Sequence, residues 1–208
     1  RSTRKESSAA SDVYKRQGSS SPGKSSSSSV LGQALGRDFF DTLRTKQQTG
    51  YVAFANAYEE EDQLFELFIV QSSTHQPDEL LARFELFLEG YVKDFETTFP
   101  EGRFEEIRNS LITSLNNPPT NLRSMAHHLN TLAFKHHGNF DRIEERTEAL
   151  TNLTYEQLKQ DTKTFLSRNN SKRLAITLEG KIPEGKKFSY KKVSAEKIKG
   201  EGSYIAFP

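Results

Sequence analysis

The chain has 208 residues, of which 34% are hydrophobic and 27% charged, and its formal net charge is +1. This length and composition are typical of a globular protein with one main domain. The absence of cysteine excludes disulfides, thiol catalysis and cysteine-ligated metal, and leaves the compartment open. No apolar run reaches the ~20 residues of a membrane helix, and no apolar segment follows the basic N-terminus as in a signal peptide, so we expect no membrane partner.

Positive charge is confined to the two ends of the chain. Residues 1–29 carry six Lys and Arg against two acids, and residues 181–208 carry seven against three, which leaves residues 30–180 at −7. A nucleic-acid site needs basic and aromatic side chains clustered on one folded face. We therefore expect no nucleic-acid partner.

Residues 1–29 are predicted to be a disordered Ser-rich segment. They have almost no apolar side chains and end in a Ser/Gly/Pro run from Gly18 to Ser29, a composition that cannot offset the entropy cost of ordering the backbone. Residues 7–17 read like translated cloning or sequencing-adapter DNA, so we hypothesise that the segment is non-native. Residues 181–208 are predicted to be a basic C-terminal extension.

Between these ends, residues 30–180 show a clear pattern of elements. A helix is predicted over about 31–46, then strands over about 50–58 and 63–72, with an acidic turn between them. The second strand is nearly continuous in apolar residues, so it should lie centrally and be covered on at least one face. Pro77, the Phe99-Pro100 pair and Thr154 mark helix starts, and Asn117-Pro118-Pro119 marks a helix end. Further elements are a helix over about 120–137, a short helix after 139–141, a helix from 154 to about 166 and a strand over 174–178.

This order of helix, two strands, several helices and a late strand predicts an α+β fold. The sheet should be mostly antiparallel, with the helices packed largely on one face. No internal repeat is visible.

The stretch from Leu43 to Tyr51 is the most informative part of the sequence. It places Arg44 and Tyr51 seven residues apart across the predicted junction of helix and strand, and Gly50, with a positive φ, would end the helix. Arginine offers a planar fork of donors, and the tyrosine hydroxyl, with an ordinary pKa of about 10, stays protonated near neutral pH. Both side chains suit recognition of a carbonyl oxygen. The alternative is that the two residues merely pack, as most such residues do.

The run Leu-Arg-Thr-Lys-Gln-Gln-Thr-Gly-Tyr at 43–51 resembles the C-terminal-half signature of the insulinase/pitrilysin family of zinc metallopeptidases. The segments 104–107, 139–141 and 153–158 support the resemblance, which covers about residues 30–180. It implies a domain of the metallopeptidase-like LuxS/insulinase type, without part of its sheet and without the zinc-binding N-terminal half of the protease. Thr49 stands where relatives usually carry an aliphatic residue.

The resemblance also implies roles. Tyr51 would hydrogen-bond the scissile carbonyl of a peptide substrate as it becomes an oxyanion, and Arg44 would hold a neighbouring substrate carbonyl, so both are candidate catalytic and substrate-binding residues. Zinc would be bound by the N-terminal half of the same protease, and this chain alone would be inactive. A second interpretation is a non-catalytic scaffold or peptide-binding domain of an insulinase-like assembly.

Two other kinds of site are weakly indicated. The histidines, at 75, 127, 128, 136 and 137, form no His-x-x-Glu-His motif or its reverse, so no metal site is predicted in this chain. The segment from Gly18 to Ser25 fits the P-loop pattern letter by letter. A phosphate cradle also needs a buried strand before the loop and a helix after it, and the sequence predicts neither there.

Overall fold

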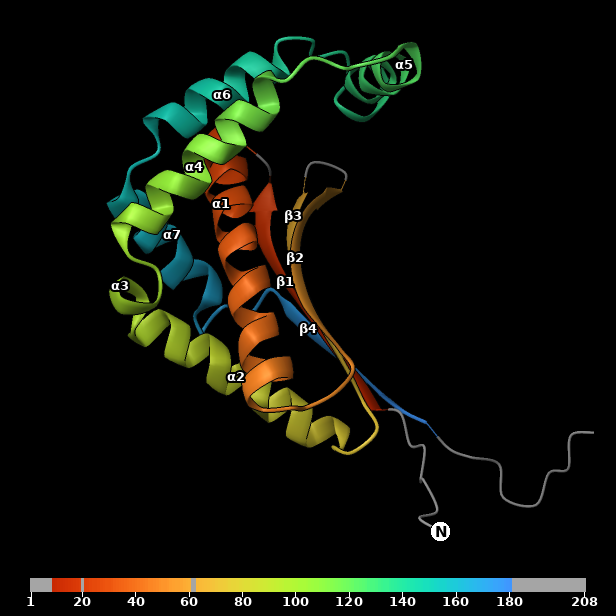
Figure 1. The fold of residues 1–208 in the computed structure, drawn as a ribbon, viewed down its shortest axis with the longest axis vertical. Coiled ribbons are helices and arrows are strands. Elements are labelled where there is room, and N and C mark those ends of the chain that lie inside the picture. Colours follow the sequence, from red (N-terminus) through yellow and green to blue (C-terminus); the bar gives the residue numbers. More distant parts are fainter. Residues whose placement is uncertain (1–8, 20, 61–62, 181–208) are drawn as a thin grey trace, which may run out of the picture.

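The computed structural model describes residues 9–19, 21–60 and 63–180. These residues form a four-stranded antiparallel sheet with helices over one of its faces, as Figure 1 shows. The strands lie in the order β2-β3-β1-β4. Their bounds are Ala9–Ser19 for β1, Val52–Glu60 for β2, Gln63–Ser72 for β3 and Arg173–Glu179 for β4. The predicted α+β class is confirmed.

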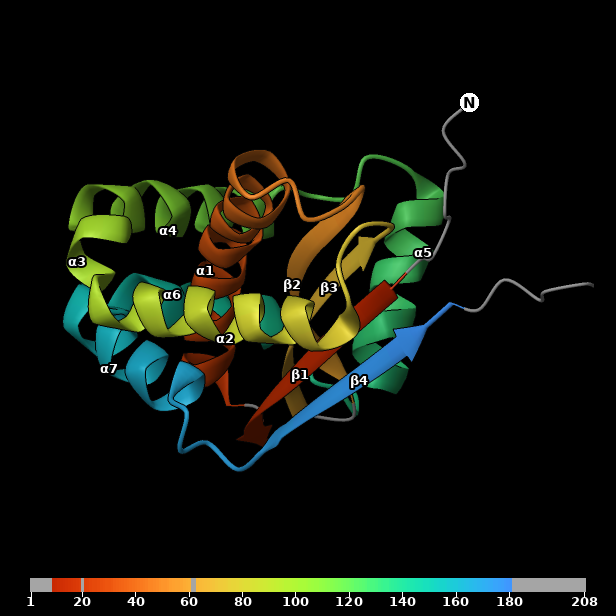
Figure 2. The ribbon, with the colours of Figure 1, turned by 90° about the horizontal axis from the view of Figure 1, so that it is seen from below.

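The helical layer contains three helices of 16 to 18 residues, α1, α2 and α4, and several shorter ones. Figure 2 shows how α1 and α2 cross over the sheet, and how β1 and β4 run side by side. None of the helices in the described ranges has the length and apolar character of a membrane span. The helices are α1 (Pro22–Phe39), continued by the π-helical turn η1 (Phe40–Lys46), α2 (Pro77–Lys93), α3 (Phe95–Thr98), α4 (Glu101–Asn116), α5 (Leu122–Asn130), continued by η2 (Thr131–Lys135), α6 (Arg142–Asn152) and α7 (Tyr155–Leu166).

The core lies between the helices and the inner face of the sheet. Strand β3 alternates along its length, and Leu64, Phe68 and Val70 are buried on the helix side. The ring of Phe39 on α1 lies 5.3 Å from that of Phe68 and 5.2 Å from that of Phe84 on α2, centroid to centroid. Each such buried side chain stabilises the fold by about 1.5–3 kcal/mol. These contacts fix α1 and α2 against β3, which is central as predicted.

Helix α1 begins earlier than the sequence predicts, and the prediction of disorder for residues 1–29 is wrong over the described part of that segment. Ser25 to Ser28 are buried. Two of their hydroxyls have partners, since Ser26 donates to the carbonyl of Pro22 and Ser27 donates to Asp161 Oδ2 on α7 at 2.7 Å. A serine tract can therefore be helical when its hydroxyls bond within the helix and to a neighbour.

Strand β1 was also missed by the sequence analysis. Its backbone pairs with β3 on one side and with β4 on the other. These two strands satisfy its backbone N–H and C=O groups, and the amino-acid composition of the segment does not reveal this pairing. A strand thus precedes α1 within the sheet. The hypothesis that residues 7–17 are non-native remains a hypothesis, and residues 181–208 lie outside the described ranges.

The P-loop alternative meets a different obstacle from the one that the sequence predicted. A strand does precede the segment and a helix does follow it. However, Gly18 and Ser19 still belong to β1, and Pro22 already belongs to α1. Almost no loop remains between them to wrap a phosphate group.

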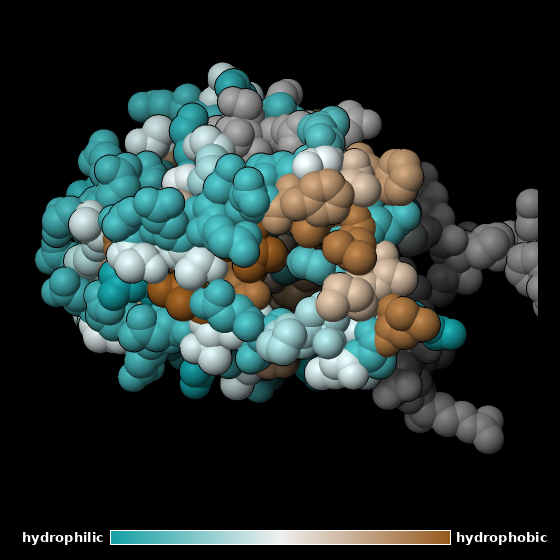
Figure 3. All heavy atoms as spheres, turned by 90° about the horizontal axis from the view of Figure 1, so that it is seen from above, coloured by the Kyte–Doolittle hydropathy of each residue, from teal (hydrophilic) through white to brown (hydrophobic). Residues whose placement is uncertain are grey.

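The opposite face of the sheet is not covered by any of the described helices (Figure 1). Several large apolar side chains are exposed on its strands, and α5 presents an apolar stripe in which no residue is buried. Figure 3 shows apolar side chains gathered on the side where α5 lies. The exposed residues are Phe54, Leu174, Ile176 and Leu178 on the strands and Leu122, Met125 and Leu129 on α5, followed by Phe134.

Candidate functional site

The candidate site lies where η1 ends and β2 begins. In η1 the backbone widens, and the N–H of Gln47 donates to the carbonyl of Thr42, five residues back, at 3.0 Å. Turns of this π-helical kind are rare and are frequent at functional sites. Leu43 is buried in the core, which anchors the turn, whereas Arg44 next to it is half-buried.

Arg44 and Tyr51 are brought together by this turn. The guanidinium carbon of Arg44 lies 5.2 Å from the centroid of the Tyr51 ring and 5.1 Å from that of the Phe40 ring. Cation–π contacts of this kind contribute about 0.5–1 kcal/mol at exposed sites. The Tyr51 side chain is 82% exposed. The two predicted donors therefore form one surface unit, with the arginine held between two aromatic rings.

The segment between the two donors is fixed by Thr49 and Gly50. Thr49 is fully buried, and both its N–H and its hydroxyl donate to the carbonyl of Leu43, at 3.0 and 2.7 Å. The hydroxyl thus gives a structural reason for a polar residue at 49. A Cβ on Gly50 would lie 2.0 Å from the carbonyl oxygen of Gln71 on β3, so only glycine fits there.

The expected positive φ is not at Gly50. It occurs two residues earlier, at Gln48, whose φ is 50°. The helix therefore ends at Gln48 in the left-handed conformation, and Gly50 instead allows the chain to lie close to β3. This backbone is sparsely populated for residues other than glycine, and such conformations concentrate at functional sites.

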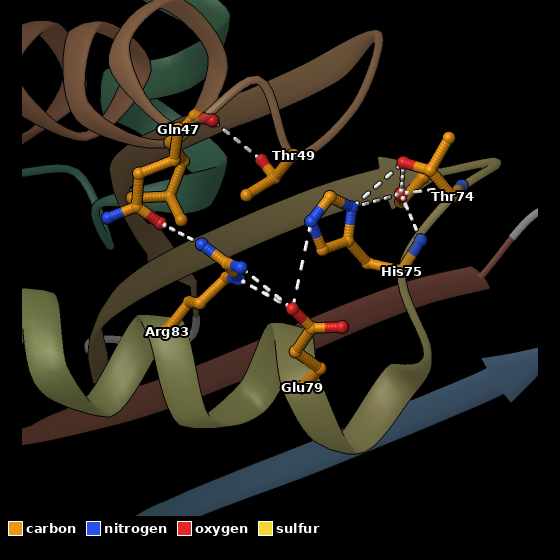
Figure 4. A network of polar contacts seen from close by, with 8 residues as sticks. Gln47, Thr49, Thr74, His75, Glu79 and Arg83 are labelled. Atoms are coloured by element: carbon orange, nitrogen blue, oxygen red, sulfur yellow. Dashed lines mark hydrogen bonds and ion pairs between the residues drawn. The ribbon is translucent and has the colours of Figure 1, made fainter.

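A polar network ties the site to α2, as Figure 4 shows. Arg83 donates through Nη1 to Gln47 Oε1 at 2.9 Å and through Nη2 to Glu79 Oε1 at 2.7 Å. The Nε2 of His75 lies 3.7 Å from the same oxygen of Glu79. The hydrogen bond from Arg83 lowers the pKa of Glu79, with a smaller contribution from His75. Gln47 is thereby held from a helix 36 residues further along the chain.

The sequence analysis left the roles of Lys46, Gln47 and Gln48 open, and the structure gives Gln47 this structural contact. Phe40 and Arg83 were missed altogether. Phe40 lies four residues before Arg44, a spacing that brings side chains together on a helix and was therefore readable in the sequence. Arg83 carries no such signal, because its partner is distant in sequence.

The described residues contain no group of three or more His, Cys, Asp and Glu side chains that could hold a metal ion. The site itself offers donors rather than a nucleophile or a base: the guanidinium of Arg44 and the hydroxyl of Tyr51. Fold and site together thus define an α+β domain that presents hydrogen-bond donors, suited to carbonyl oxygen, on its surface.

Comparison with known proteins shows what this domain is similar to. Residues 30–130 match a family described as PQQ synthase PqqF-like, C-terminal lobe domain 4. The A-factor-processing enzyme of Saccharomyces cerevisiae is 24% identical over 162 residues, which are 74% of this chain and 15% of that protein. Protease 3 of Escherichia coli is 30% identical over 131 residues, or 63% of this chain and 14% of that protein. The chain is homologous to peptidases of the insulinase/pitrilysin type, its matching family model describes a C-terminal-lobe domain, and it spans about 15% of the length of such relatives.

Solved structures agree in fold. Pitrilysin superposes with a TM-score of 0.71 at 23% identity, covering 92% of this chain and 20% of that one. An inactive domain of a peptidase from Pseudomonas fluorescens superposes with a TM-score of 0.62 at 16% identity, covering 82% of this chain and 40% of the other. At these identities the likeness concerns the fold.

Proposed function

We propose that this domain contributes Arg44 and Tyr51 to a zinc endopeptidase that cleaves peptides in an enclosed chamber. The observation that supports this most directly is the joint presentation of the two donors at the surface, with the Arg44 guanidinium 5.2 Å from the Tyr51 ring. The arginine is oriented by two rings, and the loop behind it is fixed by Thr49. Donors held in this way lose little freedom when a substrate binds.

In the proposed mechanism the substrate lies across this pair as an extended chain. Arg44 donates to a backbone carbonyl in both the ground state and the transition state, so it contributes mainly to binding. Tyr51 donates to the scissile carbonyl, whose oxygen gains negative charge as the reaction proceeds, so its hydrogen bond strengthens in the transition state. Zinc, held by the N-terminal half of the protease, would supply the Lewis acid and the nucleophile.

The uncovered face of the sheet supports a place inside a larger protease. Phe54, Leu174 and Leu178 are 40%, 57% and 58% exposed there, and α5 adds its own apolar stripe. Exposed apolar surface of this extent is unusual on an independent protein and marks contact with a partner or ligand. We infer that the N-terminal half of the protease and the peptide substrate face these surfaces.

A second candidate function is a non-catalytic scaffold or peptide-binding wall in an assembly of the same family. The likeness in fold to a domain described as inactive favours this alternative. The upstream reading frame of the intact gene distinguishes the two, because only the peptidase requires His-x-x-Glu-His and a distal zinc-ligating glutamate there.

The purified 208-residue chain gives the first test. We expect it to bind no stoichiometric zinc by metal analysis and to hydrolyse no peptide in a fluorogenic assay, and we expect activity in the intact protease. Chelator-sensitive cleavage by the chain alone would contradict the proposal, because the donors would then need no second half.

A further inference from the structure

A second polar pocket lies between α1, β2 and α6, away from the Arg44–Tyr51 pair. Its volume is about 310 Å³. Ser28 and Ser29 line it from α1, Asn56 and Glu59 from β2, and Arg146 from α6. These β2 residues lie five to eight positions beyond Tyr51, a separation of about 17–27 Å along an extended strand. The pocket therefore belongs to a different part of the domain.

One arginine, Arg146, and one glutamate, Glu59, line this pocket, and Arg142 lies beside it. Arg142 donates through Nη2 to both carboxylate oxygens of Glu59, at 2.7 and 2.6 Å, so this acid already has its partner. Arg146 has no carboxylate within ion-pairing distance among the described residues, and its Nη2 donates to the hydroxyl of Ser29 at 3.1 Å. When Arg142 beside the pocket is included, two guanidinium groups face the single carboxylate of Glu59, which leaves one positive charge in excess.

The Arg146 guanidinium is also incompletely hydrogen-bonded. Its Nε is buried and has no partner among the described residues. Burial lowers the pKa of Arg146, and the neighbouring charge of Arg142 lowers it further. A buried donor without a partner destabilises the fold, and more so when the group is charged. Arg146 lines the pocket, and the planar fork of an arginine suits a carboxylate or phosphate group.

The rest of the lining suits a small ligand. Gly32 packs so closely on β2 that an added Cβ would lie 2.5 Å from Ala57 Cβ, and both residues line the pocket. The hydroxyl of Ser28 makes no hydrogen bond to any described residue and lies beside the pocket, where it is free to donate. Small side chains thus leave room next to the arginine, and a hydroxyl provides a second donor.

We propose that this pocket, defined by Arg146, Ser28, Ser29 and the adjoining part of β2, binds an anionic oxygen group. The ligand is a carboxylate, such as a peptide C-terminus, or a phosphate. Arg146 supplies the charge and a charge-assisted hydrogen bond, and Ser28 supplies a neutral one.

The test is an NMR titration of the isotope-labelled 208-residue chain at constant ionic strength. One arm uses inorganic phosphate, and the other uses an acetylated dipeptide with a free C-terminal carboxylate, with its amide as the uncharged counterpart. We expect saturable shifts at Gly32, Ala57 and the Arg146 Nε–H, and no shift with the amide. The ligand that saturates at the lower concentration identifies the source.

Three variants make the result specific. Arg146→Gln should weaken binding at least tenfold, which corresponds to about 1.4 kcal/mol. Arg146→Lys keeps the charge and should retain part of the affinity, which covers the case in which the glutamine variant does not fold. Arg168→Gln is the matched control, because Arg168 pairs with Glu89 elsewhere, and it should bind as the unaltered chain does. Absence of saturable shifts in both arms, or unchanged binding by Arg146→Gln, would overturn the proposal.

Discussion

Replacing Glu66 with glutamine should change how the stability of the domain depends on pH. Glu66 lies on the inner face of β3 and is 0% exposed, and neither carboxylate oxygen has a hydrogen-bond partner among the described residues. Burial raises its pKa well above the ordinary value. The nearby Tyr91 hydroxyl is buried too. Burial therefore favours the neutral form of the carboxyl in the folded state.

The sign follows from proton linkage. The folded state keeps the Glu66 proton to a higher pH than the unfolded chain, whose glutamate has a pKa of about 4.3. The contribution to stability is complete below that pH and is lost as the pH rises toward the folded-state pKa, at up to about 1.4 kcal/mol per pH unit. Glu66→Gln removes the titration but keeps the size and polarity. Its stability relative to the unaltered chain should therefore rise with pH by the same amount.

Urea unfolding followed by circular dichroism at pH 5, 6 and 7 measures this difference. Glu66→Leu provides a second comparison, since it also removes the unpartnered polar atoms and should be more stable than Glu66→Gln by about 1–3 kcal/mol at every pH. Parallel pH profiles for the unaltered chain and Glu66→Gln would refute the reasoning, because they would mean that Glu66 finds a charged partner or water.

Two further predictions concern the contact of Gly50 with β3 and the pairing of β1 with β4. Gly50→Ala should lower the unfolding free energy by about 1–3 kcal/mol in the same assay, because the backbone of Gln71 has to move. The control is Gly90→Ala, where an added Cβ meets nothing within 4 Å, and it should be neutral or stabilising by up to about 1 kcal/mol. Equal effects of the two substitutions would show that the contact at Gly50 is unimportant. Deletion of residues 1–20 removes β1, the neighbour of both β3 and β4. Hydrogen exchange should then show that the amides of β4, Arg173–Glu179, lose their protection. Retained protection there would mean that β4 does not depend on β1.

The sequence predicted those parts of the fold that depend on local patterns. Strand β3 has the predicted bounds, and Pro77 begins α2 as expected. Strand β1 was missed because its stabilisation comes from pairing with strands more than 40 residues away, which composition does not reveal. The misassigned φ has a similar cause. A glycine after a helix is usually a left-handed cap, and only the packing of β2 on β3 shows that Gly50 has another role.

In the candidate site, too, the local pattern was predictable from the sequence and the long-range contacts were not. Arg44 and Tyr51 were expected to act together, and the structure places the guanidinium against the ring. Their catalytic role stays a prediction. No sequence pattern indicates the Gln47–Arg83 contact or the pocket at Arg146, because each joins elements that only the tertiary fold brings together.

The most direct test of the proposed function is steady-state kinetics of Tyr51→Phe in the intact protease. The substitution keeps the ring against Arg44 and removes only the hydroxyl. By analogy with the loss of one oxyanion donor, kcat should fall about 10²–10³-fold, or ~3–4 kcal/mol, with KM changed much less. Arg44→Ala should instead raise KM and lower kcat/KM. With folding confirmed by circular dichroism, a Tyr51→Phe activity within about twofold of the unaltered enzyme would contradict the role of Tyr51 as a transition-state donor.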